Sequence, residues 1–345
     1  MVLSEKFLKP YKTKKPPFGP IGEFTFYRCV SIDTPVLCAD LVWRPAGDIP
    51  IGMKIVGFDE EANPRRKIVD AYVTDNSIEE ADCVQIQLED GTLLYSTPDH
   101  KWLAKVGADH KLRWVYAKDL LNATGRKDAA CCYLPKYADV WEEDHSYEGG
   151  YLAAAFDGEG SLGSKGELSF AQVDNDMLKH VCAYLDKFGF KYSVSEEKAS
   201  VKFGSSKTCY TVRIYGHRQV LKFLGMFRPK RLLSLYLNST QVTALQTEAN
   251  GNSYKKVVDV KPAGKKKIAM LSTSCKTHIT AGFPSHNTYS RWLEDKGRRE
   301  YWWETCKRVV EYNCILDPQV TPEEEEALFD ALFHMEVFPA GRQLW

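Results

Sequence analysis

The 345-residue sequence lacks any apolar run near the ~18 residues that a membrane-spanning helix needs. Its 46 basic and 46 acidic side chains balance, which excludes a simple polycation that binds nucleic acid by net charge alone. The basic start of the chain lacks the apolar core of a secretory signal, so we expect a cytoplasmic protein with no membrane partner. Ten cysteines are present, yet no two form a CxxC pair. Their spacing argues against a zinc ribbon or a disulfide framework and favours reduced thiols with separate roles.

What the sequence does contain changes character several times along the chain. Alternating apolar and polar residues predict strands from Cys29 to about Leu134 and again over 255–283. Between these regions, helical spacing mixed with strand patterns predicts an α/β unit of about 100 residues, a normal size for a small domain. The last 58 residues have a helical pattern. We therefore expect nested domains with the ranges 1–28, 29–140, 145–245, 250–287 and 288–345.

The two ends of the outer β region carry reactive side chains. Cys29 opens it, and the sequence His286-Asn287-Thr288 closes it. The thiol can attack the carbonyl of Arg28 and turn that peptide bond into a thioester, from which the Thr288 hydroxyl can take the acyl group. The Asn287 side-chain amide can then close a succinimide and cut the chain, with His286 as the proton donor to the leaving group.

A third element lies between the two ends, in the segment GTLLYSTPDHKWL. Thr97 and His100 stand three residues apart at the end of an expected strand, where they can polarise the Arg28 carbonyl and protonate the departing amide nitrogen. Over 29–287 the set resembles the N-terminal, TxxH and C-terminal HN blocks of an intein. The resemblance implies an all-β Hint horseshoe that splices itself out without a cofactor and ligates Arg28 to Thr288. An autoprocessing domain that cleaves without ligating is the alternative.

Two further residues leave the first step of splicing open. Trp102 follows His100 by two residues, and Cys275 precedes Asn287 by twelve. In a minority class of inteins, a Trp, this internal Cys and a Thr before the HN pair carry the initial attack. Here Ser285 stands in place of that Thr, and Cys29 is present. Cys275 is therefore a coordinating thiol, a nucleophile that initiates splicing, or a buried structural cysteine, and the sequence does not decide among them.

The α/β insert contains LAAAFDGEG at residues 152–160, which resembles the LAGLIDADG motif of homing endonucleases. The small residues Gly150, Ala153 and Ala154 would let two such helices approach closely. The resemblance implies an αββαββα domain that cuts double-stranded DNA with Mg²⁺. By register, Glu159 is the metal-binding acid.

Weaker parts of the same resemblance give supporting residues. Gly158 joins Glu159 at the metal, Asp157 supports the helix end, Gln172 lies near the site, and Lys230 is a proton shuttle or charge stabiliser. Residues 151–250 hold 13 basic and 9 acidic side chains, and this excess of positive charge favours phosphate binding. Only one copy of the motif is found, so cleavage should need a homodimer through the motif helix. The alternative is a decayed insert that packs but does not cut.

The flanking residues resemble a third family. With 29–287 removed, the chain reads FTFYR-TYSRWLEDKGRREYWWETC and continues to PAGRQLW. This resembles the N-terminal part of an adenosylcobalamin-dependent ribonucleotide reductase. The 86 flanking residues cannot supply that family's catalytic barrel, so we expect a fragment of the host enzyme, and adenosylcobalamin is implied only for the complete host.

Overall fold

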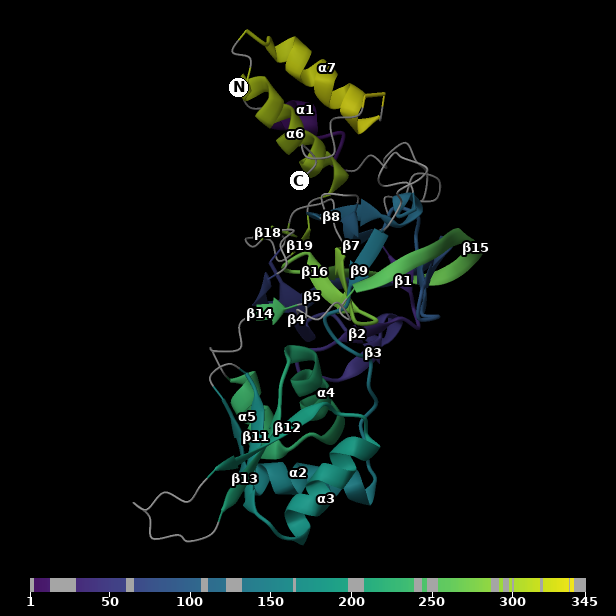
Figure 1. Cartoon of the computed structure of the whole chain (residues 1–345). Helices are drawn as coiled ribbons and strands as arrows, with labels where there is room; N and C mark the ends of the chain where they lie inside the picture. Colours follow the sequence, from purple (N-terminus) through teal and green to yellow (C-terminus); the bar gives the residue numbers. More distant parts are fainter. Residues whose placement is uncertain are drawn as a thin grey trace. The chain divides into compact units, whose positions relative to one another are not determined.

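The structure is a computed structural model of the whole chain (Figure 1). It describes residues 3–12, 29–59, 65–106, 111–121, 132–163, 166–197, 208–238, 244–246, 254–286, 292–293, 298–299, 301–316, 319–334 and 336–337. The chain divides into two compact units. One consists of Arg28–Asn287, and the other combines Met1–Tyr27 with Thr288–Trp345.

The β part of the first unit is built from short strands and two long ones. Its strands are β1 Val30–Ser31, β2 Pro35–Leu37, β3 Trp43–Pro45, β4 Lys54–Phe58, β5 Arg65–Leu88, β6 Leu93–Ser96, β7 Lys101–Val106, β8 Lys111–Tyr116, β9 Cys132–Pro135, β14 Ala244–Gln246, β15 Tyr254–Thr273, β16 Thr277–Thr280 and β17 Phe283–His286. In the described residues they form one mostly antiparallel network in which β5 and β15 pair along most of their length. Because β14 pairs with β5, the network resumes at Ala244, six residues before the expected start at 250.

Strand register brings the two ends of this unit into the same network. Val30 in β1 pairs with Ser96 in β6 and with Ala269 in β15. At the other end, β17 lies between β16 and β7, and its residue Ser285 pairs with Trp102. Since the TxxH segment connects β6 to β7, both ends of the unit reach it through neighbouring strands.

The insert is a four-stranded sheet with helices. Its elements are α2 Tyr147–Glu159, β10 Gly160–Leu162, β11 Leu168–Val173, α3 Asp176–Lys187, β12 Tyr192–Glu197, β13 Cys209–Ile214, α4 His217–Phe227 and α5 Lys230–Leu237. The strand order is β10-β11-β13-β12. The expected αββαββα order is followed by one more helix, because Arg228 adopts a left-handed conformation (φ 54°) and Pro229 has no N–H to continue α4.

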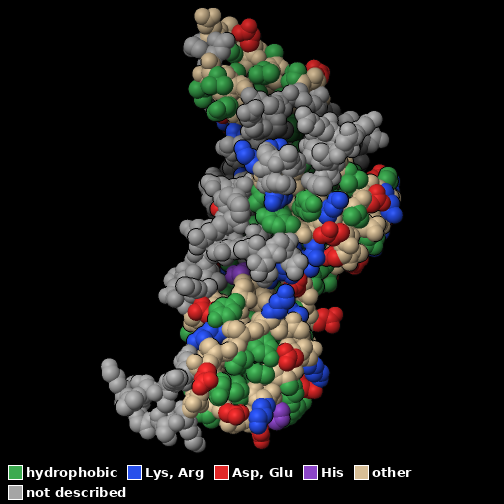
Figure 2. All heavy atoms as spheres, in the orientation of Figure 1, with side chains coloured by type: hydrophobic (Ala, Val, Ile, Leu, Met, Phe, Trp, Pro, Cys, Tyr) green, Lys and Arg blue, Asp and Glu red, His purple; other side chains and the backbone are tan. Residues whose placement is uncertain are grey.

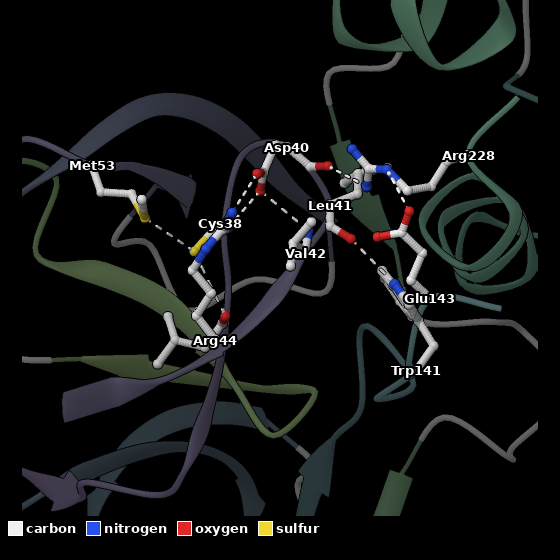
Figure 3. Close-up of polar contacts among 10 residues, drawn as sticks. Cys38, Asp40, Leu41, Val42, Arg44, Met53, Trp141, Glu143 and Arg228 are labelled. Atoms are coloured by element: carbon white, nitrogen blue, oxygen red, sulfur yellow. Dashed lines mark hydrogen bonds and ion pairs between the residues drawn. The ribbon is translucent and has the colours of Figure 1, made fainter. Parts of the chain in front are cut away.

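Specific contacts join the insert to the β part (Figure 3). The indole Nε1 of Trp141 donates to the carbonyl of Leu41 over 3.2 Å, and the Arg228 guanidinium donates to the carbonyl of Asp40 over 3.1 Å. Leu41 is itself in a left-handed conformation (φ 61°) and fully buried, which a non-glycine residue adopts only when its surroundings hold it there. A Cβ on Gly225 would lie 2.2 Å from the Trp141 ring nitrogen, so only glycine fits beneath the indole.

The second unit packs residues from both chain ends around one apolar core. Its elements are α1 Glu5–Leu8, β18 Trp292–Leu293, β19 Arg298–Arg299, α6 Trp302–Leu316 and α7 Pro322–Phe333. Leu3 and Leu8 share a buried cluster with Val310 and Phe329. An acidic run begins α7, where Thr321 forms a capping box and Pro322 is the first helical residue, in keeping with the helical pattern of the last 58 residues. Segments that flank 29–287 in the sequence therefore fold together.

No helix among the described residues is both long and apolar enough to cross a membrane. The nine cysteines in that part of the chain are all free thiols. On the face drawn in Figure 2, Lys and Arg side chains are interspersed with Asp and Glu, in keeping with the balanced overall charge.

Candidate functional site

Thr97 holds the N-terminal end of the β unit at Cys29. The Cys29 N–H donates to Thr97 Oγ1 over 3.1 Å, and the Thr97 N–H donates to the Cys29 carbonyl over 3.0 Å. Both residues are buried. The Cys29 nitrogen belongs to the Arg28–Cys29 peptide bond. Thr97 is therefore hydrogen-bonded to the nitrogen that would be the leaving group if the Cys29 thiol attacked the Arg28 carbonyl. Arg28 itself is outside the described residues.

His100 lies one turn beyond Thr97. Its N–H donates to the Thr97 carbonyl over 3.1 Å, and its own carbonyl accepts from Ala117 over 2.8 Å. The imidazole Nε2 is 2.8 Å from Ser285 Oγ, and both side chains are fully buried. The ring of Trp102 packs 4.8 Å from the His100 ring, which fills the space beside the imidazole. The turn and the packed rings restrict His100 to a narrow range of orientations.

His286 ends strand β17 and is also fully buried. Its backbone pairs with Thr277 on one side and with Lys101 on the other, and the Trp114 ring lies 5.1 Å from the imidazole. The register therefore places His286 beside the strand that follows His100. Asn287 and Thr288 lie outside the described residues.

Cys275 lies in the turn between β15 and β16, partly buried. Its Sγ is 3.2 Å from the Thr277 carbonyl and 3.3 Å from Thr277 Oγ1. A Cβ on Gly57 would lie 2.5 Å from the same sulfur, so the thiol is packed tightly against β4. In the described structure, Cys29 and Cys275 have different hydrogen-bond partners. The role of Cys275 stays open.

The Cys29 thiol is electrostatically unusual. Burial raises its pKa well above the ordinary value of 9.0, and Cys83, Glu79 and Asp75 add to the rise. A thiolate is the attacking form, so the resting thiol is protonated and needs a base or a conformational change before it reacts.

This predicts a steep pH dependence of the first step. Because the pKa is raised, the thiolate fraction grows about tenfold per pH unit throughout the neutral range, without levelling off. We expect N-terminal cleavage of the Asn287→Ala chain, induced by a thiol kept at constant thiolate concentration, to accelerate continuously from about pH 6 to about pH 10, as measured by gel densitometry. A plateau that begins near pH 9, where a thiol of ordinary pKa levels off, would contradict the raised pKa.

A second histidine near the C-terminal end was not singled out from the sequence. His278 pairs with Ser285 across the β16–β17 hairpin and is fully buried. Desolvation, and then the charge of His286, lowers its pKa to about 3, so it is neutral at physiological pH. The signal was available in the sequence, because His278 and His286 bracket a Gly-containing turn typical of a short hairpin.

In the insert, helix α2 has one buried apolar face and one exposed face of small residues. Leu152 and Phe156 are buried, whereas Gly150, Ala154 and Gly158 are exposed at intervals of four residues. Ser146 caps the start of the helix by accepting from the N–H of Gly149 over 3.2 Å. The helix therefore carries a stripe of small residues on its open side.

Glu159 is the last residue of α2 and is exposed. In the described part of the chain its carboxylate has no hydrogen-bond or ion-pair partner. Lys230 is the exposed first residue of α5. Gln172 instead uses its amide on Val173 and Met177, so the structure does not join it to Glu159.

The end of α2 and the start of α5 cap each other, an arrangement that was not predicted from the sequence. The Asp157 carboxylate accepts from the N–H groups of Arg231 and Leu232 over 2.9 and 3.3 Å. In return the Arg231 guanidinium donates to the carbonyls of Asp157, Phe156 and Gly160. These bonds satisfy the end groups of both helices and anchor the backbone around Glu159. The signal was the Pro-Lys-Arg start of a helix, in which Lys230 alone was predicted to have a role.

Comparison with protein families identifies two parts of the chain. Residues 146–227 match the family model described as a LAGLIDADG-like domain. The insert is a LAGLIDADG-like domain. Residues 282–345 match the family model described as a ribonucleotide reductase alpha domain, so the C-terminal flank is similar to part of such a domain.

Curated relatives agree with the second match. The adenosylcobalamin-dependent ribonucleoside-triphosphate reductases of Lactobacillus delbrueckii subsp. bulgaricus and Lactobacillus acidophilus are 45% and 44% identical over 69 residues. Those alignments cover 17% of this chain and 9% of each relative, so the chain spans a small part of the relatives' length.

Inteins are among the solved structures to which the chain is similar. They include a DnaB intein from Synechocystis sp. PCC 6803 (9% identity, TM-score 0.33, 75% of this chain and 98% of that one). The gp41-1 intein is another (8% identity, TM-score 0.29, with the same coverages). Scores this low carry no weight, so the arrangement at the ends of the β unit has to support any assignment to splicing.

Proposed function

We propose that residues 29–287 excise themselves and join Arg28 to Thr288. One observation carries the proposal: the chain divides into compact units at Arg28 and at Asn287, and the two flanks share one core although 29–287 separates them in sequence. A segment that folds by itself between two halves of another unit is what excision requires.

The first step would open the peptide bond between Arg28 and Cys29. The Cys29 thiol loses its proton as Sγ forms a bond to the Arg28 carbonyl carbon, the C–N bond breaks, and the Cys29 nitrogen gains one proton to become an amine, so the step takes up no net proton. Thr97 Oγ1 already accepts a hydrogen bond from this nitrogen and can hold it during bond breaking. His100 is the proton donor that the proposal assigns to the same nitrogen.

The later steps need no external reagent. Thr288 Oγ attacks the thioester carbonyl, and Cys29 leaves as a thiol that takes the hydroxyl proton. The Asn287 amide nitrogen then attacks its own main-chain carbonyl, which breaks the bond to Thr288 and leaves a succinimide. His286 supplies the proton to the departing Thr288 amine, onto which the Arg28 acyl group finally migrates from oxygen.

For the LAGLIDADG-like domain we propose metal-dependent cutting of double-stranded DNA by a homodimer. The sheet face away from the helices carries groups that can hydrogen-bond to DNA, namely Ser161, Ser169, Ser193, Ser195 and Arg213. Hydroxyls and a guanidinium contact both phosphates and base edges. The small-residue stripe of α2 would let two copies approach closely.

Mg²⁺ fits the donors at the end of α2. Glu159 offers a carboxylate without a partner in the described structure, and Gly158 offers a main-chain carbonyl, both hard oxygen ligands. Among the described residues no group of three or more His, Cys, Asp or Glu side chains forms a metal site, so two copies would have to share the ion. When bound, Mg²⁺ would stabilise charge on the scissile phosphate.

The host of this element is proposed to be a ribonucleotide reductase of the adenosylcobalamin-dependent class, as the names of its relatives indicate. The 86 flanking residues hold no site that we assign to that cofactor, so its chemistry belongs to the complete host.

Intact-mass analysis after expression tests the splicing proposal. We expect the full-length chain to give an 86-residue ligated product and a 259-residue excised segment. Two cleaved flanks without a ligated product would favour the autoprocessing alternative. A chain that stays at full length, with purified protein folded by circular dichroism, would contradict the proposal.

A further inference from the structure

Ser285 links the two ends of the β unit. It lies in β17, one residue before His286, and its backbone pairs with Trp102 on β7 and His278 on β16. Its hydroxyl is fully buried and lies 2.8 Å from Nε2 of His100. A residue of the C-terminal end therefore contacts the imidazole assigned to the N-terminal step.

The direction of this hydrogen bond decides the tautomer of His100. Within the described part of the chain, Oγ has no hydrogen-bond partner besides His100. With Ser285 as the donor, the buried hydroxyl proton has an acceptor in Nε2, and the imidazole proton is left on the buried Nδ1, for which the described residues show no acceptor. With Nε2 as the donor, the hydroxyl proton would lack the acceptor instead. We take the first arrangement, because it leaves the proton on the nitrogen from which the N-terminal step would draw it. A neutral imidazole carries one proton, so Nε2 as the acceptor leaves that proton on Nδ1.

The tautomer of His100 matters because the TxxH turn places His100 next to Thr97, which is hydrogen-bonded to the Cys29 nitrogen. His100 is itself bonded to Thr97 through the backbone. A proton on Nδ1 makes that nitrogen a donor while Nε2 is occupied by Ser285. The opposite tautomer would leave His100 without a proton to give from Nδ1.

We propose that Ser285 is a positioning residue that fixes the Nδ1–H tautomer and the ring orientation of His100. It acts through His100 and touches none of the reacting atoms. Strand β17, which ends at the C-terminal junction, would in this way affect the rate of cleavage at the N-terminal junction. This inference rests on the proposed splicing function for its kinetic consequence, but the tautomer can be measured independently.

The kinetic test uses the full chain with Asn287→Ala, so that only N-terminal cleavage by added thiol is followed. Ser285→Ala is expected to slow cleavage by about 10- to 100-fold, because a histidine in the wrong tautomer is a poor proton donor. Ser285→Thr keeps the hydroxyl and should restore most of the rate. Thr280→Val is the matched control, since Thr280 is equally buried on the neighbouring strand and its hydroxyl has no partner in the described structure.

The spectroscopic test uses the Cys29→Ala, Asn287→Ala chain, which stays intact. Nitrogen-15 chemical shifts of His100 should show the Nδ1–H tautomer in this chain and in its Ser285→Thr variant. In the Ser285→Ala variant they should show the Nε2–H tautomer or a mixture of the two. An unchanged tautomer in Ser285→Ala would overturn the inference, as would an equal rate loss in Thr280→Val. If the parent chain does not cleave, the splicing proposal fails, and the tautomer still decides this inference.

Discussion

Replacing Cys29 by alanine is expected to abolish N-terminal cleavage and ligation while cleavage at Asn287 continues. Cys29 is the thiol whose own peptide nitrogen is hydrogen-bonded to Thr97, so it is adjacent to the bond that must open. Without the sulfur no thioester can form, and the rate of N-terminal cleavage should fall by at least about a thousandfold. Intact mass would then show residues 1–287 and the free C-terminal flank.

The variant Cys275→Ala distinguishes the two cysteines as the nucleophile of the first step. Cys275 bonds to Thr277 within its own hairpin and packs on Gly57, so its loss should change the splicing rate modestly. Cys132→Ala is the control for removing a buried thiol, because Cys132 is equally buried and is not among the groups that shift the pKa of Cys29. If Cys275→Ala alone stops N-terminal cleavage, then Cys275 initiates splicing and the role assigned to Cys29 is wrong.

Replacing Glu159 by glutamine is expected to abolish DNA cleavage and to leave splicing and DNA binding intact. The glutamine amide has nearly the shape of the carboxylate but no charge to hold Mg²⁺, so the cleavage rate should fall by at least about a hundredfold. Glu159 takes part in none of the contacts that join the insert to the β part, which run through Leu41, Trp141 and Arg228.

Selection of cleaved sites from a randomised DNA library, run with the wild-type chain, supplies the substrate for this measurement. Glu148→Gln is the matched control, since Glu148 lies in the first turn of the same helix, away from Glu159, and forms an ion pair with Lys187. Cleavage that survives Glu159→Gln would contradict the assigned acid. A wild-type chain that binds DNA but selects no cleaved site would favour a decayed insert.

The contacts in Figure 3 bear on how separable the two proposed activities are. The apolar core of the insert is continuous with that of the β part, since Leu41 and Phe58 belong to the same buried cluster as Leu152 and Phe227. Removing the insert would expose part of this cluster to water, at a cost of roughly 25 cal/mol for each Å² of apolar surface. The LAGLIDADG-like domain therefore contributes to the fold of the unit that contains Cys29.

The sequence by itself determined the candidate chemistry and the nested order of the chain. Cys29, the TxxH segment and the HNT ending are recognisable because each is a set of reactive side chains close together in sequence. The LAGLIDADG-like motif is recognisable for the same reason. The change from alternating to helical spacing located the insert, because the period of apolar residues depends only on local backbone geometry.

Only the tertiary structure decided which of these groups meet. Thr97 reaches Cys29 across 68 residues, and Ser285 reaches His100 across 185, through strand registers that no local pattern specifies. The mutual caps of Asp157 and Arg231, 74 residues apart, depend on how α5 packs against the end of α2. Each pair is joined by long-range packing, and the energy of such packing is spread over many residues rather than encoded in a short motif.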